Sequence, residues 1–182
     1  MGGVLDFLYR LTEWLREATL LPEFSLWVTD WPLAIWLQEH FLAIPGFQTI
    51  HILAIAALFG SVLMLNLRVL GKKGMDLSLA DAFSRYRAWT WWSLAALVLS
   101  GVILLISEPV RNMVNSVFWL KMIALFLAVT VSLWFQGSVR RNMARIEASP
   151  QGVASIRVGA WAVIVLWLIV MTGGRWIAYS PN

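Results

Sequence analysis

Four apolar segments constrain this chain more than any other feature of its sequence. They cover 46–69, 88–107, 117–137 and 157–177. Each is long enough to cross about 30 Å of hydrocarbon as a helix of about 20 residues. The connections between them are short, so we expect consecutive helices to be antiparallel neighbours. The sequence therefore predicts an all-α integral membrane protein with a four-helix up-down bundle over 45–182.

The composition agrees with a membrane protein and excludes several other classes. Hydrophobic residues make up 60% of the chain and charged residues 13%, which is more apolar surface than one soluble core of this size could bury. The absence of cysteine excludes disulfides, iron–sulfur clusters and covalently attached haem. The basic residues form no surface with aromatic platforms, so we expect no nucleic-acid binding.

The distribution of lysine and arginine predicts the orientation of the bundle. Basic side chains gather in the segments that join spans 1 and 2 and spans 3 and 4, whereas acidic side chains gather on the other side. By the positive-inside rule these two segments are cytoplasmic, and both termini are expected on the periplasmic side of a bacterial inner membrane. The basic residues in question are Arg68, Lys72, Lys73, Arg85, Arg87, Arg140, Arg141, Arg145 and Arg157.

The segment 1–44 is predicted to be an amphipathic interfacial region with two short helices. The second helix is expected to start at the cap Asp30, with Pro32 in its first turn and with Pro45 and Gly46 separating it from span 1. Both helices should lie on the bilayer or on a partner protein. The first is indicated by an apolar stripe with helical spacing: Val4, Leu8, Leu11, Leu15 and Ala18.

A few polar side chains fall within the spans, close to their periplasmic ends. Such groups are unfavourable in hydrocarbon unless they are paired or hydrated, so each is a candidate site residue. Helix rise places them within about 10 Å of the boundary, and Gln48 shares a helix face with His51. We expect the outer helix ends to enclose a polar pocket built from Gln48, His51, Glu108, Lys121 and Arg175.

Each of these residues also has a simpler interpretation. The Lys121 side chain can extend to the headgroups, and Glu108 and Arg175 can be ordinary interfacial charges. Imidazole is too short to do the same. For His51 the alternative to ligand binding is a hydrogen bond to a hydroxyl or carbonyl of another helix, and the sequence favours neither.

Three ligands fit the chemistry of His51. A b-type haem would take the neutral imidazole on iron, with Lys121 and Arg175 near its propionates. The other histidine, His40, could reach the same haem only if the chain folds back at Pro45 or if two subunits share the haem. Copper suits imidazole and thioether ligands, although the methionines have no ligand-like spacing. A quinone or lipid headgroup could accept hydrogen bonds from His51 and Gln48.

Catalytic motifs are missing from the sequence. It contains no G-x-S-x-G, no H-E-x-x-H and no phosphate-binding glycine loop. The middle of every span is apolar, so no carboxylate relay for ions is expected. We therefore predict a protein without enzymatic activity of its own. It either binds a redox ligand or metal at His51, or serves as a structural or accessory subunit of a membrane complex or homo-oligomer.

A family resemblance centres on the first span. The stretch "IPGFQTIHILAIAALFGSVLMLNLRVLG", with "SLWVTDWPLAIWLQEH" before it and "FWLKMIALFLAV" after it, resembles a bacterial family of small four-span inner-membrane proteins of unknown function. That family looks distantly like the copper-resistance D membrane domain. The likeness covers roughly 25–137 and implies a His at His51 and a Lys at Lys121. Where the family has an acidic residue before Leu67, this chain has Asn66.

Overall fold

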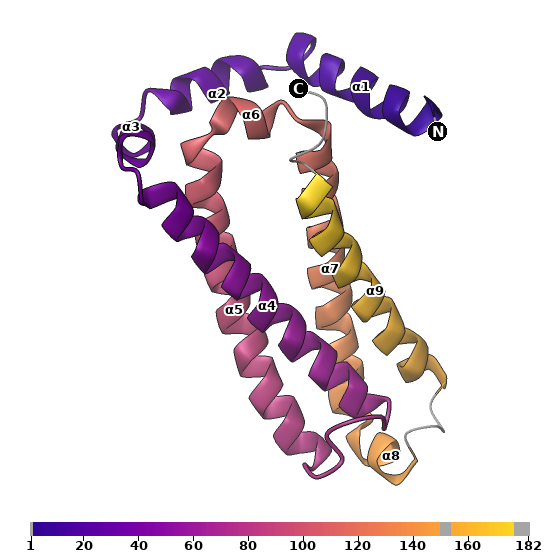
Figure 1. Cartoon of the computed structure of the whole chain (residues 1–182). Helices are drawn as coiled ribbons and strands as arrows, with labels where there is room; N and C mark the ends of the chain where they lie inside the picture. The colour runs from indigo at the N-terminus through magenta and orange to yellow at the C-terminus, as the bar shows by residue number, and fades with distance from the viewer. Residues whose placement is uncertain (1, 150–153, 177–182) are drawn as a thin grey trace. The chain divides into compact units, whose positions relative to one another are not determined.

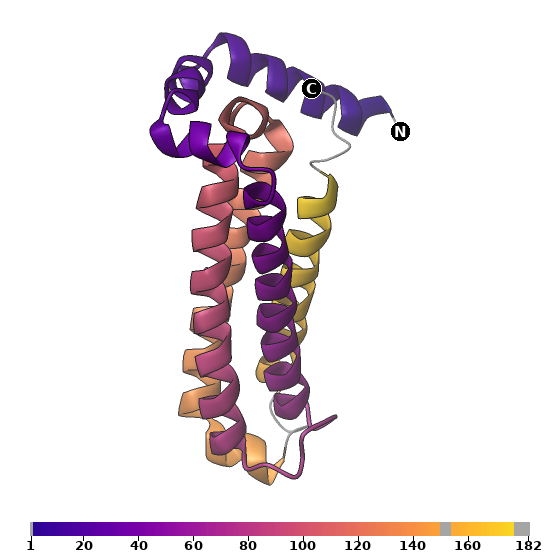
Figure 2. The same ribbon diagram turned by 60° about the vertical axis from the view of Figure 1, so that its left-hand side comes forward.

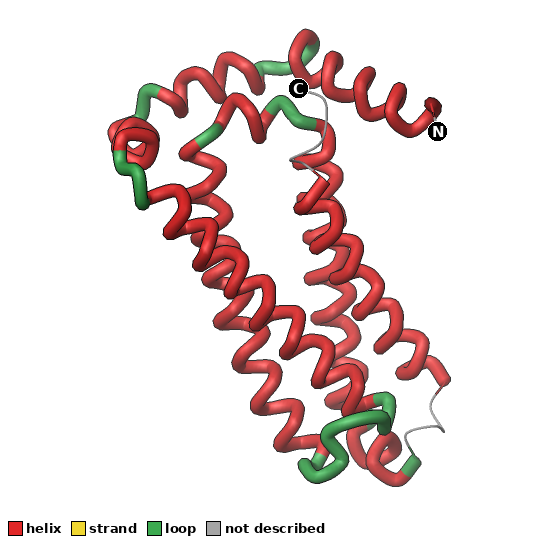
Figure 3. Tube along the Cα trace, in the orientation of Figure 1, coloured by secondary structure: helices red, strands yellow, loops and turns green. Residues whose placement is uncertain are grey.

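The computed structural model describes residues 2–149 and 154–176, and these residues form helices, turns and loops without any strand. Figure 3 shows how short the connections between the helices are. Four helices form a bundle, and each is long and apolar enough to cross a membrane. They are α4 (Ala43–Val69), α5 (Leu79–Ser107), α7 (Ser116–Arg141) and α9 (Ala154–Trp176), labelled in Figure 1. The predicted all-α four-helix bundle is confirmed.

The chain divides into two compact units, each built from several segments. Unit 1 comprises 1–52, 97–123 and 172–182, and unit 2 comprises 53–96 and 124–171. The long helices α4, α5, α7 and α9 each contribute residues to both units.

Unit 1 holds the short helices that precede and interrupt the bundle. These are α1 (Gly2–Glu17), α2 (Leu21–Thr29), α3 (Pro32–Glu39) and α6 (Pro109–Met113). Helix α2 packs against α6, as Figures 1 and 2 show from two sides. The buried Thr12 Oγ1 lies 2.9 Å from Ser116 Oγ and accepts a hydrogen bond from the Ser116 backbone N–H. Helix α1 thus satisfies an amide in the first turn of α7 that has no partner within its own helix.

The N-terminal region differs from the sequence-based expectation. It contains three helices instead of two, and Asp30 ends α2 instead of capping α3. Pro45 and Gly46 lie inside the first turn of α4, so they do not separate it from the preceding helix. Proline is tolerated there because the first amides of a helix have no helical acceptor. The interruption falls at residues 40–42.

In unit 2, helices α7 and α9 approach closely. A Cβ atom added at Gly159 of α9 would lie 2.8 Å from Phe135 Cδ2 of α7, which is too close for a side chain larger than hydrogen. The indole N–H of Trp167 on α9 donates to Ser132 Oγ on α7 at 3.0 Å. Small residues at such contacts allow helix backbones to pack tightly in a bilayer, where apolar burial alone drives little association.

Helix α5 begins well before its predicted span at 88–107. Ser78 caps the start of the helix: the Asp81 N–H donates to Ser78 Oγ at 3.1 Å, and the Ser78 hydroxyl donates to Asp81 Oδ2 at 2.6 Å. The first turns after this cap bury Leu79, Ala82 and Phe83. The helix is therefore longer than a hydropathy window suggests, because packing stabilises its N-terminal turns.

Unit 2 also contains a set of contacts around a buried arginine, which we call the Arg68–Glu147 clasp. Arg68, only 4% exposed, donates from Nε to the Leu77 carbonyl at 3.0 Å and from Nη2 to Glu147 Oε1 at 3.4 Å. Glu147, in the short helix α8 (Met143–Ala148), also accepts from the Leu79 N–H at 3.1 Å. Gly74 has φ +70°, a left-handed conformation that suits glycine, and packs against the Arg68 side chain.

Candidate functional site

His51 lies in α4 and contacts α5 within unit 1. Its Nδ1 lies 2.9 Å from Ser100 Oγ, and the ring is half-buried. Ser100 itself is buried and directs its hydroxyl towards the Leu97 carbonyl of its own helix at 3.2 Å. The hydrogen bond between helices that the sequence allowed as one interpretation of His51 is therefore present.

The Ser100 contact favours one tautomer of His51. The Ser100 hydroxyl is within reach of the Leu97 carbonyl, so it can donate there and accept a hydrogen bond from His51 Nδ1. Nε2 then has a free lone pair. Within the described part of the chain, Nε2 has no hydrogen-bond partner, and it is not one of the fully buried polar atoms. The atom that would bind a metal or accept a hydrogen bond is therefore accessible.

Gly101 sets the position of the imidazole ring. A Cβ atom at Gly101 would lie 3.3 Å from His51 Cε1 and 3.8 Å from Nδ1. The ring therefore lies directly over the glycine, next to the serine that bonds it. Together Ser100 and Gly101 form a seat on α5 that holds the imidazole in one orientation, as partners of ligating histidines do in metal sites.

Lys121 and Gln48 lie in the same unit as His51. Lys121 is half-buried in α7, and its ammonium is close enough to interact electrostatically with the imidazole. Gln48 precedes His51 by about one helical turn on α4 and is exposed. The structure thus brings Lys121 towards His51 and leaves Gln48 at the surface of the same helix face.

The remaining predicted site residues are placed differently. His40 is exposed, its Nδ1 lies 2.8 Å from the Trp36 carbonyl, and its ring stacks on Trp36 with centroids 4.5 Å apart. Glu108 is exposed and forms an ion pair with Arg111 at 2.9 Å. The side chain of Arg175 lies outside the part of the chain that the structure describes. No ligand role of any of these residues is tested by these contacts, so each stays a prediction.

Sequence reasoning identified His51 but missed its seat. Neither Ser100 nor Gly101 was predicted to contact His51. A signal was available, because small and hydroxyl residues on one helix are the usual neighbours of a polar residue on another. The sequence could not indicate which helix faces His51, since this depends on the register of α4 against α5.

Residues 41–180 match a family described as "Family of unknown function (DUF6644)". The chain belongs to this family. The matched region of DUF6644 contains His51, Ser100 and Lys121, whereas His40 and helices α1 to α3 precede it. No curated protein and no solved structure matches the chain.

Membership of DUF6644 supports the coarser part of the resemblance seen in the sequence. A family of unknown function and four helices with the length and composition of spans together indicate a multi-pass membrane protein whose helices contact lipid. None of the comparisons shows the distant likeness to the copper-resistance D domain. DUF6644 itself assigns no activity, so the function must be argued from the residues of this chain.

Proposed function

We propose that this chain is a multi-pass protein of the bacterial inner membrane, with periplasmic termini, that binds a ligand through Nε2 of His51 and has no catalytic site of its own. The observation that carries the proposal is the state of the imidazole. Nδ1 is held by Ser100 on another helix, and Nε2 is left accessible with a free lone pair. This division of roles between the two ring nitrogens is typical of ligating histidines.

The number of ligating groups favours a b-type haem over copper. Among the described residues, no group of three or more His, Cys, Asp or Glu side chains gathers at one point. A copper ion would therefore depend on the thioether groups of methionines, or on a second molecule. A porphyrin supplies four nitrogen ligands itself and needs as little as one histidine from the protein. Lys121 supports the same choice, because an ammonium near the imidazole could pair with a propionate.

A second axial ligand would come from His40 or from another copy of the chain. His40 is exposed and bonded to its own helix, so it could join the haem only after leaving the Trp36 ring. A homodimer that places one His51 on each side of a shared haem needs no such rearrangement. A quinone held by His51 and the exposed Gln48 is the remaining alternative, and it requires no iron.

The test is the absorption spectrum of the full-length protein purified in mild detergent from bacteria supplied with a haem precursor. We expect a Soret band that disappears in His51→Ala and remains in His40→Ala, a matched control on the exposed histidine. Loss in both variants would indicate that the two histidines share one haem. Metal analysis of the same samples separates copper from haem: stoichiometric copper that depends on His51 would replace the haem assignment. Absence of both would refute the proposal for haem and metal.

A structural or accessory subunit is the second candidate, and a specific observation favours it. Helices α1 to α3 expose large apolar side chains while α1 is fixed to the rest of unit 1 by the buried Thr12–Ser116 contact. A fixed apolar surface suits docking onto the bilayer interface or onto a partner subunit. Its exposed aromatic residues include Phe7, Tyr9, Trp14, Phe24, Trp27 and Trp36. A colourless, metal-free protein that co-purifies with one defined partner would support this candidate.

A further inference from the structure

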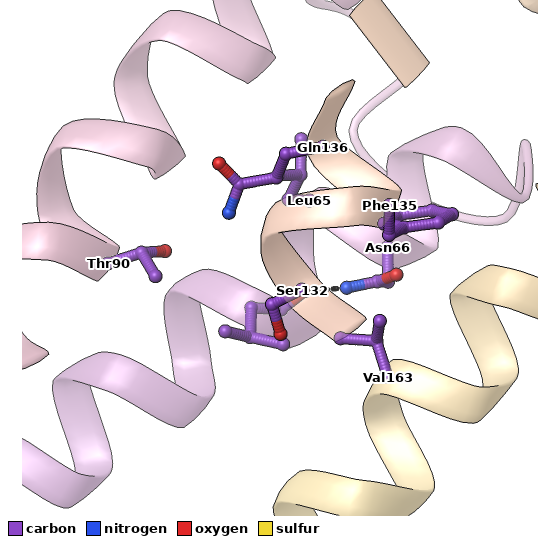
Figure 4. A pocket seen from close by; sticks show the side chains of 8 residues that line it. Leu65, Asn66, Thr90, Ser132, Phe135, Gln136 and Val163 are labelled. Carbon is purple, nitrogen blue, oxygen red and sulfur yellow. Dashed lines mark hydrogen bonds between the residues drawn. The ribbon is translucent and has the colours of Figure 1, made fainter. Parts of the chain in front are cut away.

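Unit 2 contains a small cavity that the proposed function does not use. Its volume is about 10 Å³, and side chains from all four long helices surround it (Figure 4). Half of these side chains are polar, which is unusual for a cavity between apolar helices. The cavity is lined by Val62, Leu65, Asn66, Thr90, Ser132, Phe135, Gln136 and Val163.

Asn66 of α4 is the most constrained polar residue of this lining. It is 2% exposed, and its Nδ2 donates to the Val62 carbonyl of its own helix at 2.7 Å. Its Oδ1 is the only fully buried side-chain nitrogen or oxygen in the described part of the chain without a hydrogen-bond partner. A buried amide oxygen without a donor is strongly unfavourable, and native proteins usually satisfy such an atom with protein or water.

Two possible donors belong to the same lining. Ser132 Oγ accepts from the Trp167 indole, and its own hydroxyl hydrogen has no acceptor among the described residues. Gln136, one turn further along α7, makes no side-chain hydrogen bond to any described residue. Neither group donates directly to Asn66 Oδ1. A bridging molecule could therefore accept from one of them and donate to the amide oxygen.

We propose that this cavity binds one water molecule, which donates a hydrogen bond to Asn66 Oδ1 and accepts one from the Ser132 hydroxyl. The volume fits a single water, and the site offers the two or more polar partners that a buried water needs. The water connects α4 to α7 and, through the Ser132–Trp167 bond, to α9. Asn66, whose side chain bonds directly only to its own helix, would thereby also contribute to the contacts between helices.

The test uses the full chain in lipid vesicles with ¹⁵N-labelled asparagine, studied by solid-state NMR. Magnetisation transferred from water should reach the Asn66 side-chain amide, whose signal is identified by its loss in Asn66→Leu. Asn142, which is partly exposed, provides a positive control for transfer from bulk water. A buried Asn66 amide that receives no water signal while Asn142 does would overturn the proposal.

Two serine variants test the partner assignment. Ser132→Ala removes the proposed donor, so the water signal at Asn66 should fall several-fold. Ser61→Ala removes a buried hydroxyl in the same unit that bonds only to its own helix, so the signal should not change. An undiminished signal in Ser132→Ala would show that the water does not depend on Ser132. The result is independent of any ligand at His51, which belongs to unit 1.

Discussion

His51 and Asn66 occupy the same helix, α4, and both place a polar side chain in an apolar sequence, yet their partners differ. His51 Nδ1 bonds to Ser100 on α5, whereas Asn66 Nδ2 bonds to Val62 of its own helix. Only the first bond fixes one helix against another. The structural effect of an intramembrane polar residue therefore depends on where its partner lies, and residue type alone does not reveal this.

The largest effect is expected at the close contact between α7 and α9. It tests whether tight packing stabilises unit 2 more than polar hydrogen bonds do. Gly159→Ala should destabilise the protein by about 1–3 kcal/mol, because its Cβ would meet Phe135 at 2.8 Å and push α9 from α7. Thermal unfolding in mild detergent measures the change. Gly60→Ala is the matched control, since a Cβ at Gly60 has no neighbour within 4 Å. Equal stability of the two variants would show that the close contact does not matter.

An intermediate effect is expected when a hydrogen bond between two helices is compared with a hydrogen bond within one helix. Ser100→Ala removes a bond between helices and should destabilise the protein by about 0.6 kcal/mol, the average for such bonds in a bilayer, and by no more than about 1.7 kcal/mol. Ser61→Ala removes a bond to the Ala57 carbonyl of the same helix and should change stability by less than about 0.5 kcal/mol. Both are measured by unfolding in the same detergent. If Ser61→Ala were the more harmful change, the distinction drawn between His51 and Asn66 would fail.

The smallest effect concerns the seat of the imidazole. Gly101→Ala places a Cβ 3.3 Å from His51 Cε1, so the ring must move by a few tenths of an ångström. We expect a stability change below about 1 kcal/mol but a clear shift of the His51 ring signals in ¹⁵N-histidine NMR spectra. The signals of His40, which is exposed just after the end of α3, should stay in place. Unchanged His51 signals would mean that Gly101 does not position the ring.

Much of the fold could be predicted from hydropathy, but the short helices could not. A span must satisfy its backbone internally and must be long enough to cross the hydrocarbon, so α4, α5, α7 and α9 are visible in the sequence. Helices as short as α6 and α8 are unstable in isolation and form because other elements pack on them, as α2 packs on α6. The pattern of Ser78 and Asp81 is recognisable in the sequence as a helix cap, and it would have predicted the observed start of α5 at Leu79.

The candidate site was only partly predictable for a related reason. His51 stands out because a short imidazole inside a span cannot reach the headgroups, and this depends on the residue alone. Ser100 and Gly101 depend on how α4 and α5 are aligned, which no periodicity within either helix reveals. The unsatisfied oxygen of Asn66 is also a property of packing, because the sequence shows an amide near the end of a span and nothing about its donors.

One atom of the Arg68–Glu147 clasp, the carboxylate oxygen Glu147 Oε1, determines how substitutions in this part of unit 2 affect stability. Glu147 Oε1 accepts both from the guanidinium near the end of α4 and from the first amide of α5. Two helices therefore share a single acceptor, so a displacement of α8 loosens both at once. Substitutions at Arg68 and at Glu147 should therefore destabilise the protein by less in combination than the sum of their separate effects. Two residues that are far apart in the sequence would thus behave as one stabilising unit.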